Sequence, residues 1–167
     1  MIGKVYTMQP QPPVAAHTTW LDAGTLSIGV EYRVLDPASL IETYKDDPAA
    51  LAEMEANQPE GGFFDEGVSL HVRALADGHE YVRFDVFADE PHYHYVHPTG
   101  DANNVIDYDV PAHGPMLPWA LECLRHRLGD MLTEAGGGHL VASLDLAAIE
   151  RAVDEAERLA GAAGARR

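Results

Sequence analysis

The sequence predicts an α+β protein, in which a mostly antiparallel sheet of about five strands packs against two C-terminal helices. Between residues 25 and 110, several segments alternate apolar and polar residues, which is typical of strands with one buried face. After residue 116 the apolar residues recur every three or four positions, which indicates amphipathic helices. Asp-Pro pairs at 36–37 and 47–48 add two short helices after the first strand.

The length and composition favour a single domain. With 167 residues and an apolar fraction of 46%, the chain can bury a core of its own. Residues 1–18 include the proline-rich stretch QPQPPVAA, and we expect them to form an extended lead-in. We therefore place the α+β domain at 19–160 and a flexible tail at 161–167.

The first strand is expected at 25–34, because its alternate residues are apolar and share one face: Leu26, Ile28, Val30, Tyr32 and Val34. Short helices should follow at 37–45 and 48–57. In each, an Asp accepts hydrogen bonds from the helix N-terminus, and the Pro after it occupies a position that needs no backbone N–H.

A hairpin is expected next, with arms at 68–74 and 82–88. A two-residue Asp-Gly turn would place apolar residues opposite polar ones. A loop of three residues, 76–78, matches Val72 with Val82 and gives Gly78 a left-handed conformation. On the polar face this register pairs three sets of residues: Ser69 with Asp85, His71 with Arg83, and Arg73 with Tyr81.

Two more strands are expected, at 92–97 and over 103–110. The chain then changes period, and a helix at 117–135 carries one apolar seam: Leu117, Leu121, Leu124, Leu128, Met131 and Ala135. A last helix is predicted at about 144–160, with Ser143 as its N-cap.

The stretch HYHYVH, residues 92–97, is where polar chemistry is most concentrated. In a strand, His92 and His94 point to one side, and the tyrosines between them point to the other. A tight connection at 89–90 would place Tyr93 opposite Val86 and His94 opposite Asp85. The histidines would then share the polar face with Asp85, although a register shift of one residue would reverse the faces.

Two imidazoles and a carboxylate on one face are the ligand types of a Zn or non-haem Fe site. We therefore take His92, His94 and Asp85 as candidate metal ligands, with His97 as a further imidazole if the strand twists. Asp107 and His71 are expected nearby, and Tyr95 or Glu90 could act as acid or base. The alternative is a polar sheet face on which the imidazoles hydrogen-bond to carboxylates, or which a partner covers.

The charge balance argues against several partners. The net charge of −16 repels phosphate backbones and anionic lipid surfaces, so we expect neither nucleic acid nor membrane as a partner. The single cysteine, Cys123, excludes an intrachain disulfide. No apolar segment typical of a secretory signal or a membrane span is present, and we expect a cytoplasmic location.

Three functions remain open at this stage. The first is binding of a divalent metal or small ligand at the histidine strand, with or without catalysis. The second is a non-catalytic oligomerising or accessory subunit, a homo-oligomer or a protein's partner, that uses its sheet face and its helical seam. The third is a small-molecule pocket between sheet and helices, lined by Tyr93, Tyr95, Tyr108, Trp119 and Phe84. The helical stripe of Glu122, His126 and Asp130 is interpreted as solvated charge.

Overall fold

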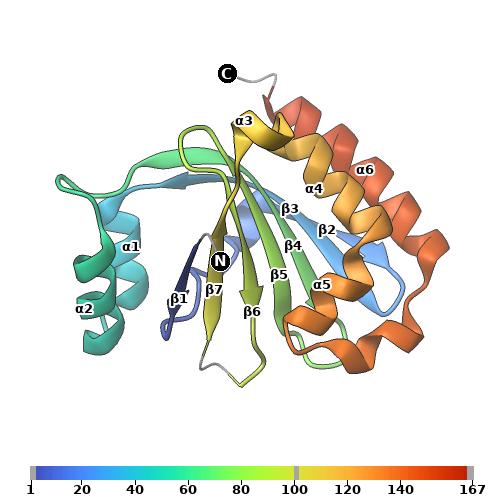
Figure 1. The fold of residues 1–167 in the computed structure, drawn as a ribbon, viewed down its shortest axis with the longest axis horizontal. Coiled ribbons are helices and arrows are strands. Elements are labelled where there is room, and N and C mark those ends of the chain that lie inside the picture. The colour runs from blue at the N-terminus through green and yellow to red at the C-terminus, as the bar shows by residue number, and fades with distance from the viewer. Residues whose placement is uncertain (1–2, 100–101, 165–167) are drawn as a thin grey trace.

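The computed structural model describes residues 3–99 and 102–164, and in this part of the chain seven strands form one antiparallel sheet (Figure 1). The spatial order is β1-β7-β6-β5-β4-β3-β2. The bounds are β1 (Gly3–Tyr6), β2 (Thr18–Ala23), β3 (Leu26–Leu35), β4 (Asp65–Ala74), β5 (Glu80–Phe87), β6 (His92–Val96) and β7 (Asn103–Asp107). Apart from β1, each strand pairs with the one before or after it in the chain.

Helices cover the two sides of the sheet unequally. The C-terminal helices α4 (Met116–His126), α5 (Leu128–Glu134) and α6 (Leu146–Gly164) lie across one face, where α6 packs on β2 to β4, and α4 and α5 pack on β5 and β6 (Figure 1). The pair α1 (Pro37–Tyr44) and α2 (Pro48–Asn57) stands apart from them, beyond β1. One-turn elements complete the order: η1 (Ala15–His17), α3 (Val110–His113) and η2 (Gly138–Ser143). In the described ranges, no helix combines the length and apolarity that crossing a membrane requires.

The main core lies between the sheet and the C-terminal helices, as the alternation predicts. Fully buried strand residues such as Leu70, Val82 and Phe84 meet Leu124 and Val153 from the helices. Burying these apolar side chains is the main stabilising term of the fold. The helical seam is thus occupied within the chain: every member from Leu121 to Ala135 is buried, and Leu117 packs against the same core.

The α+β class is confirmed, but the expected strand count of five was too low. The two additional strands are β1 and β2, and both lie at edges of the sheet. The sequence of β1, GKVY, has no alternating apolar pattern, since it joins the sheet by backbone pairing with β7 alone. Strand β2 forms a tight hairpin with β3, in which Gly24 adopts φ +78°.

The helical region also differs from the expectation. The single helix predicted at 117–135 is two helices, because Arg127 leaves helical geometry (φ −124°, ψ 2°) two residues before Gly129, a poor helix former. The last helix is capped by Asp145, whose carboxylate accepts from the Ala148 N–H at 2.9 Å, and not by Ser143. It extends to Gly164, while residues 165–167 of the expected tail lie outside the described residues, as do residues 1 and 2 of the lead-in.

In the β4–β5 hairpin, the predicted match of Val72 with Val82 and the left-handed Gly78 (φ +71°) are confirmed, but the predicted loop of three residues is wrong: Ala74 pairs with His79, which leaves a loop of four residues, 75–78. Ser69 pairs with Asp85 and His71 with Arg83, as predicted. The last predicted pair is wrong, because the register shifts after Val72 and places Arg73 opposite Glu80. This irregularity brings the Glu80 carboxylate to the polar face, where it contacts His71 and Arg83.

The seam's position in the core can be tested with two leucines. Leu124→Ala should lower the free energy of unfolding by about 3 kcal/mol, because Leu124 is fully buried between sheet and helices. Leu146→Ala is the matched control: its side chain is 70% exposed, and a change within about 0.5 kcal/mol is expected. Urea unfolding of both variants measures the difference, and equal stabilities would contradict this packing.

Candidate metal centre

The pairing of β5 with β6 decides which side chains meet on the polar face. Tyr93 lies opposite Phe84, His94 opposite Arg83, and His92 opposite Asp85. The expected register was wrong by two residues, since it paired His94 with Asp85. Because side chains alternate with a period of two, this error leaves every residue on its predicted face. His92 and His94 therefore share a face with Asp85, while the tyrosines pack toward the helices.

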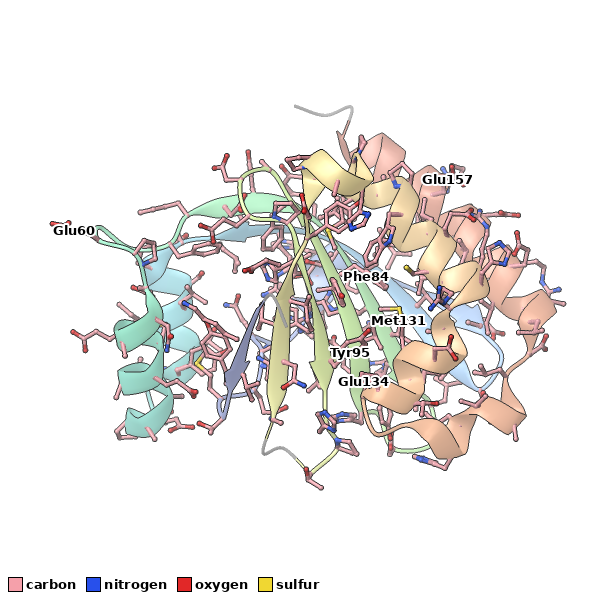
Figure 2. All side chains as sticks on the ribbon, in the orientation of Figure 1. Glu60, Phe84, Tyr95, Met131, Glu134 and Glu157 are labelled. Atoms are coloured by element: carbon pink, nitrogen blue, oxygen red, sulfur yellow. The ribbon has the colours of Figure 1, made fainter. Side chains whose placement is uncertain are left out.

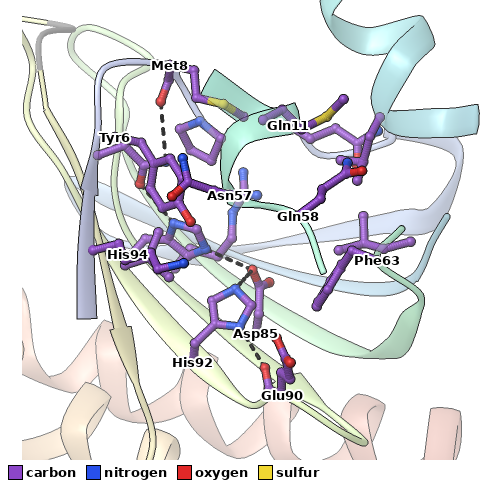
Figure 3. A pocket seen from close by; sticks show the side chains of 18 of the residues that line it. Tyr6, Met8, Gln11, Asn57, Gln58, Phe63, Asp85, Glu90, His92 and His94 are labelled. Carbon is purple, nitrogen blue, oxygen red and sulfur yellow. Dashed lines mark hydrogen bonds and ion pairs between the residues drawn. The ribbon is translucent and has the colours of Figure 1, made fainter. Parts of the chain in front are cut away.

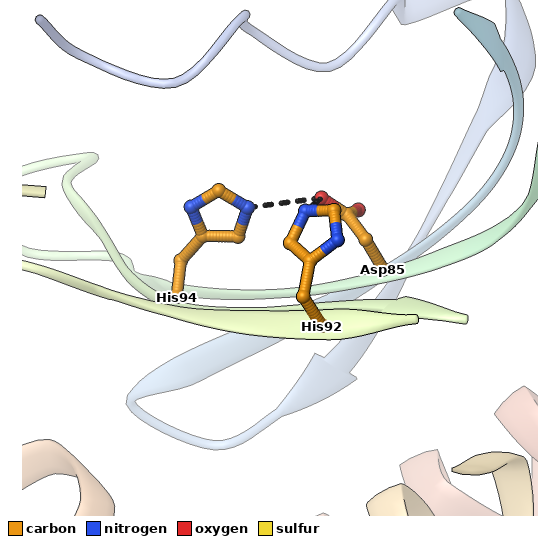
Figure 4. Close-up of side chains that lie close together, drawn as sticks. All are labelled: Asp85, His92 and His94. Atoms are coloured by element: carbon orange, nitrogen blue, oxygen red, sulfur yellow. Dashed lines mark hydrogen bonds and ion pairs between the residues drawn. The ribbon is translucent and has the colours of Figure 1, made fainter. Parts of the chain in front are cut away.

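Asp85, His92 and His94 converge on one point (Figure 4). The Nε2 atoms of His92 and His94 lie 3.2 and 3.0 Å from the same oxygen of Asp85, Oδ2. All three prospective ligand atoms lie within 4.8 Å of one another. The other carboxylate oxygen, Oδ1, accepts a hydrogen bond from the Ser69 hydroxyl, which leaves Oδ2 to the histidines.

The opposite nitrogen of each ring is held by an acceptor. His92 Nδ1 lies 2.7 Å from the Glu90 carbonyl oxygen, and His94 Nδ1 lies 2.9 Å from the side-chain oxygen of Asn103. Each Nδ1 must donate a proton there, so in the neutral rings both Nε2 atoms carry lone pairs directed at Asp85 Oδ2. Three electron-rich atoms in contact need a proton or a cation between them. Imidazoles anchored through Nδ1 in this way are typical of metal-ligating histidines.

The charges of the cluster are strongly perturbed. Burial would raise the pKa of Asp85, but hydrogen bonds from His92 and His94 and the charge of Arg83 hold it well below its usual range. Burial would lower the pKa of His92, but the hydrogen bond to Asp85, the charge of Asp85 and the hydrogen bond to the Glu90 carbonyl together outweigh burial and raise it. For His94, burial and its neighbours His92 and Arg83 prevail, and its pKa is lowered. Asp85 is therefore ionised, and His94 is the ring that favours the neutral, ligating form.

The remaining expected site residues lie outside the cluster of Asp85, His92 and His94. His97 alternates with Tyr93 and Tyr95 and lies beside Gly136, after α5, so it does not join the cluster. Asp107 pairs with His92 but is exposed. Tyr95 faces the helices, which removes it as an acid or base, whereas Glu90 lines the cavity over the cluster.

A second buried group continues from the cluster across the sheet; His71 and Arg83 were expected on this face, but their partners Glu31 and Glu80 were missed. His71 is fully buried, and its two ring nitrogens lie 2.7 Å from Glu80 and 2.8 Å from Glu31. Glu80 also accepts from Arg83 Nε at 2.7 Å. Alternation places these residues on the polar face, but their burial depends on the segment that covers it. Buried charges persist only when paired, so this network fixes the side chains next to Asp85.

The polar face is covered by the N-terminal segment and by α1 and α2. The backbone N–H groups of Thr7 and Met8 donate to Glu53 of α2, and the Tyr44 hydroxyl of α1 donates to the Gln9 carbonyl at 2.6 Å. These contacts hold residues 7–11 over the sheet, so the polar face is covered by segments of the same chain. Between cover and sheet lies a cavity of about 590 Å³, which Asp85, His92 and His94 line (Figure 3).

Two other candidate sites from the sequence were the charged stripe on α4 and a pocket between sheet and helices. The stripe on α4 is solvated, because His126 and Glu122 lie 3.5 Å apart with both side chains more than half exposed. A second cavity of about 550 Å³ opens beside Tyr93, Tyr95 and Trp119, three of the residues expected to line a small-molecule pocket between sheet and helices. Figure 2 shows Tyr95 and Met131 on this side of the sheet. Acidic side chains from α4 and α5 form much of its wall, and no cluster of metal-ligating groups lines it among the described residues.

A comparison with known protein families identifies the family of this chain. A domain of unknown function, DUF7700, matches residues 20–160. The chain belongs to this family. No curated protein and no solved structure matched the chain. The matched range includes Asp85, His92 and His94, and also α1 and α2, but it begins after β1 and residues 7–11, so the N-terminal part of the cavity's cover lies outside it.

The buried network gives a prediction about acid stability. Burial would raise the pKa of Glu80, but Arg83 and His71 lower it to about 2. A depressed acid pKa stabilises the fold above the unfolded-state pKa, about 4.3 for Glu, and this stabilisation disappears as the pH falls toward 2. Glu80→Gln should therefore cost about 3 kcal/mol at pH 7, with a difference from wild type that shrinks below about pH 5.

Denaturant unfolding between pH 7 and pH 3 measures this difference. Glu60→Gln is the matched control, because Glu60 is exposed in the loop after α2 (Figure 2), and it should follow wild type at every pH. A Glu80→Gln variant whose deficit stays constant across this range would contradict the ionised, paired state of Glu80.

Proposed function

We propose that this protein binds one divalent transition metal through Asp85 Oδ2, His92 Nε2 and His94 Nε2, at the floor of the cavity. One observation carries the proposal: two imidazole nitrogens and a carboxylate oxygen meet at one point, while the far nitrogen of each ring is tied to an acceptor. A pair of imidazoles that only served packing would not need both Nε2 atoms on one carboxylate oxygen.

The donor set favours zinc or ferrous iron. Two imidazoles and one carboxylate on one side of an ion leave further coordination positions open, as in catalytic zinc sites and non-haem iron sites. Ser69 holds Oδ1 of Asp85, which favours monodentate ligation through Oδ2. When bound, such an ion acts as a Lewis acid toward a molecule or a water in its open positions. The cavity supplies the space for that molecule, and a catalytic role follows from this arrangement.

The accessory-subunit alternative loses its main support. It rested on the apolar seam of the long helix, and that seam packs in the core of the same chain. The competing explanation of the cluster itself is a purely hydrogen-bonded one, in which a proton on His92 bridges to Asp85. The two explanations differ in metal content.

Elemental analysis of the purified, untagged protein separates them. Wild type should carry about one zinc or iron per chain, and His92→Ala/His94→Ala should carry none, since two of its three ligands are gone. The matched control is His113→Ala/His126→Ala, which removes two exposed histidines and should keep the metal. Metal-free wild type, or equal metal in the two double variants, would refute the site.

A milder variant covers the case in which the double variant does not fold. Asn103→Ala removes the acceptor of His94 Nδ1, together with a 3.4 Å hydrogen bond from Asn103 to the Met8 carbonyl, but keeps all three proposed ligands. It should weaken zinc binding about 10- to 100-fold in a chelator-competition titration. Asn104→Ala, on the opposite face of β7, should leave zinc affinity unchanged. Equal affinities for these two variants would mean that the Nδ1 anchor has no part in binding a metal.

A further inference from the structure

The cavity over the cluster holds an arginine whose hydrogen-bonding capacity is largely unused. Arg83 is 2% exposed and lines the cavity. Its Nε donates to Glu80, and its two terminal nitrogens have no hydrogen-bond partner within residues 3–99 and 102–164. A buried guanidinium with free donors is costly, so an acceptor in the cavity would stabilise it.

Strand pairing places Arg83 next to the proposed metal ligands. It lies directly opposite His94 and two residues before Asp85, on the same face of β5. Directly opposed side chains in an antiparallel pair have Cβ atoms about 5 Å apart. A small molecule that contacts the free side of Arg83 would therefore lie within reach of the open coordination positions.

A second buried guanidinium adds positive charge to the part of the cavity around Arg83. Arg33 is 4% exposed and also lines it, held through its terminal nitrogens by Gln11. Burial, and then the nearby charge of Arg83, lower the pKa of Arg33, which indicates two like charges close together. Glu31 and Glu80 offset part of this charge, but a bound anion would relieve the remaining repulsion.

The rest of the wall limits the kind of anion. Much of the cavity beneath α1 and α2 is apolar, with Met8, Leu40, Met54 and Phe63 among its lining residues. Exposed Asp89, Glu90 and Asp107 also line it, and their negative charge disfavours a doubly charged group such as a phosphate. The volume, about 590 Å³, is in the range of small-molecule sites.

We propose that the cavity binds a small organic carboxylate, with its carboxylate on the terminal nitrogens of Arg83 and its apolar part against the wall beneath α1 and α2. A guanidinium presents two parallel N–H donors, which match the two oxygens of a carboxylate. One part of this inference rests on the proposed function: the bound acid lies beside the metal and is the molecule on which that metal acts.

The test compares three probes by calorimetric titration: phenylacetate, its near-isosteric neutral amide phenylacetamide, and phenyl phosphate, which shares only the phenyl ring and a one-atom linker. Metal-free wild type, prepared with a chelator, should bind phenylacetate at least about tenfold tighter than the neutral amide. It should also prefer phenylacetate to phenyl phosphate. Zinc loading should strengthen phenylacetate binding further, because the acid then lies beside a cation.

Two variants assign the effect to Arg83. Arg83→Lys keeps the charge beside Glu80 but loses the paired donors, and should weaken phenylacetate binding by the metal-free protein at least about tenfold. Arg73→Lys is the matched control, because Arg73 lies on the same sheet face but stacks on Trp20, 3.7 Å from its ring, and does not line the cavity. If Arg83→Lys does not fold, the acid–amide comparison in wild type still decides.

The outcomes separate this inference from the metal site. Equal binding of acid and amide, or tighter binding of phenyl phosphate, overturns the carboxylate site even if zinc binds to the cluster. Unchanged phenylacetate affinity in Arg83→Lys overturns the role of Arg83. A chain that takes no zinc but prefers the acid refutes the proposed function and leaves the anion site supported.

Discussion

The polar side of this protein depends on the burial of one carboxylate. Asp85 is 3% exposed in the middle of the sheet, and its charge is tolerated there only because Ser69, His92 and His94 surround its two oxygens. Arg83, two residues away, adds positive charge and is itself paired with Glu80. The chain of contacts continues through His71 to Glu31, across four strands of the sheet. Neighbouring side chains in such a network hold one another in a single arrangement.

The sheet therefore buries two different faces. One is apolar and packs against α4, α5 and α6, which supplies most of the stability. The other is charged, and it is covered by residues 7–11 together with α1 and α2, whose small apolar cluster is centred on Tyr44, Ala50 and Met54. The proposed ligands thus lie on rigid central strands, whereas the elements that enclose the cavity are short. This division gives a site with fixed geometry beneath a thinner cover.

Local patterns in the sequence carried the prediction of the central fold. Alternation identified β3 to β6, and the position of Gly78 identified the hairpin loop, because both follow from backbone geometry alone. The edge strands β1 and β2 were missed, since pairing at an edge needs no apolar pattern. The three converging side chains were placed on one face despite a register error of two residues. The burial of His71 and Glu31 was not predictable, because it depends on a segment that long-range contacts hold over the sheet. Those contacts are with Glu53 and Tyr44 of the helices and with Arg33 of β3.

Whether Asp85, His92 and His94 form one metal-binding site can be seen by anomalous diffraction from crystals of the metal-loaded protein. A single strong peak is expected at the metal's absorption edge, about 2.0–2.2 Å from Asp85 Oδ2 and from the Nε2 atoms of His92 and His94. A metal peak bound by other residues would contradict this site. So would metal-loaded crystals in which these three atoms keep hydrogen-bond distances with no metal peak between them.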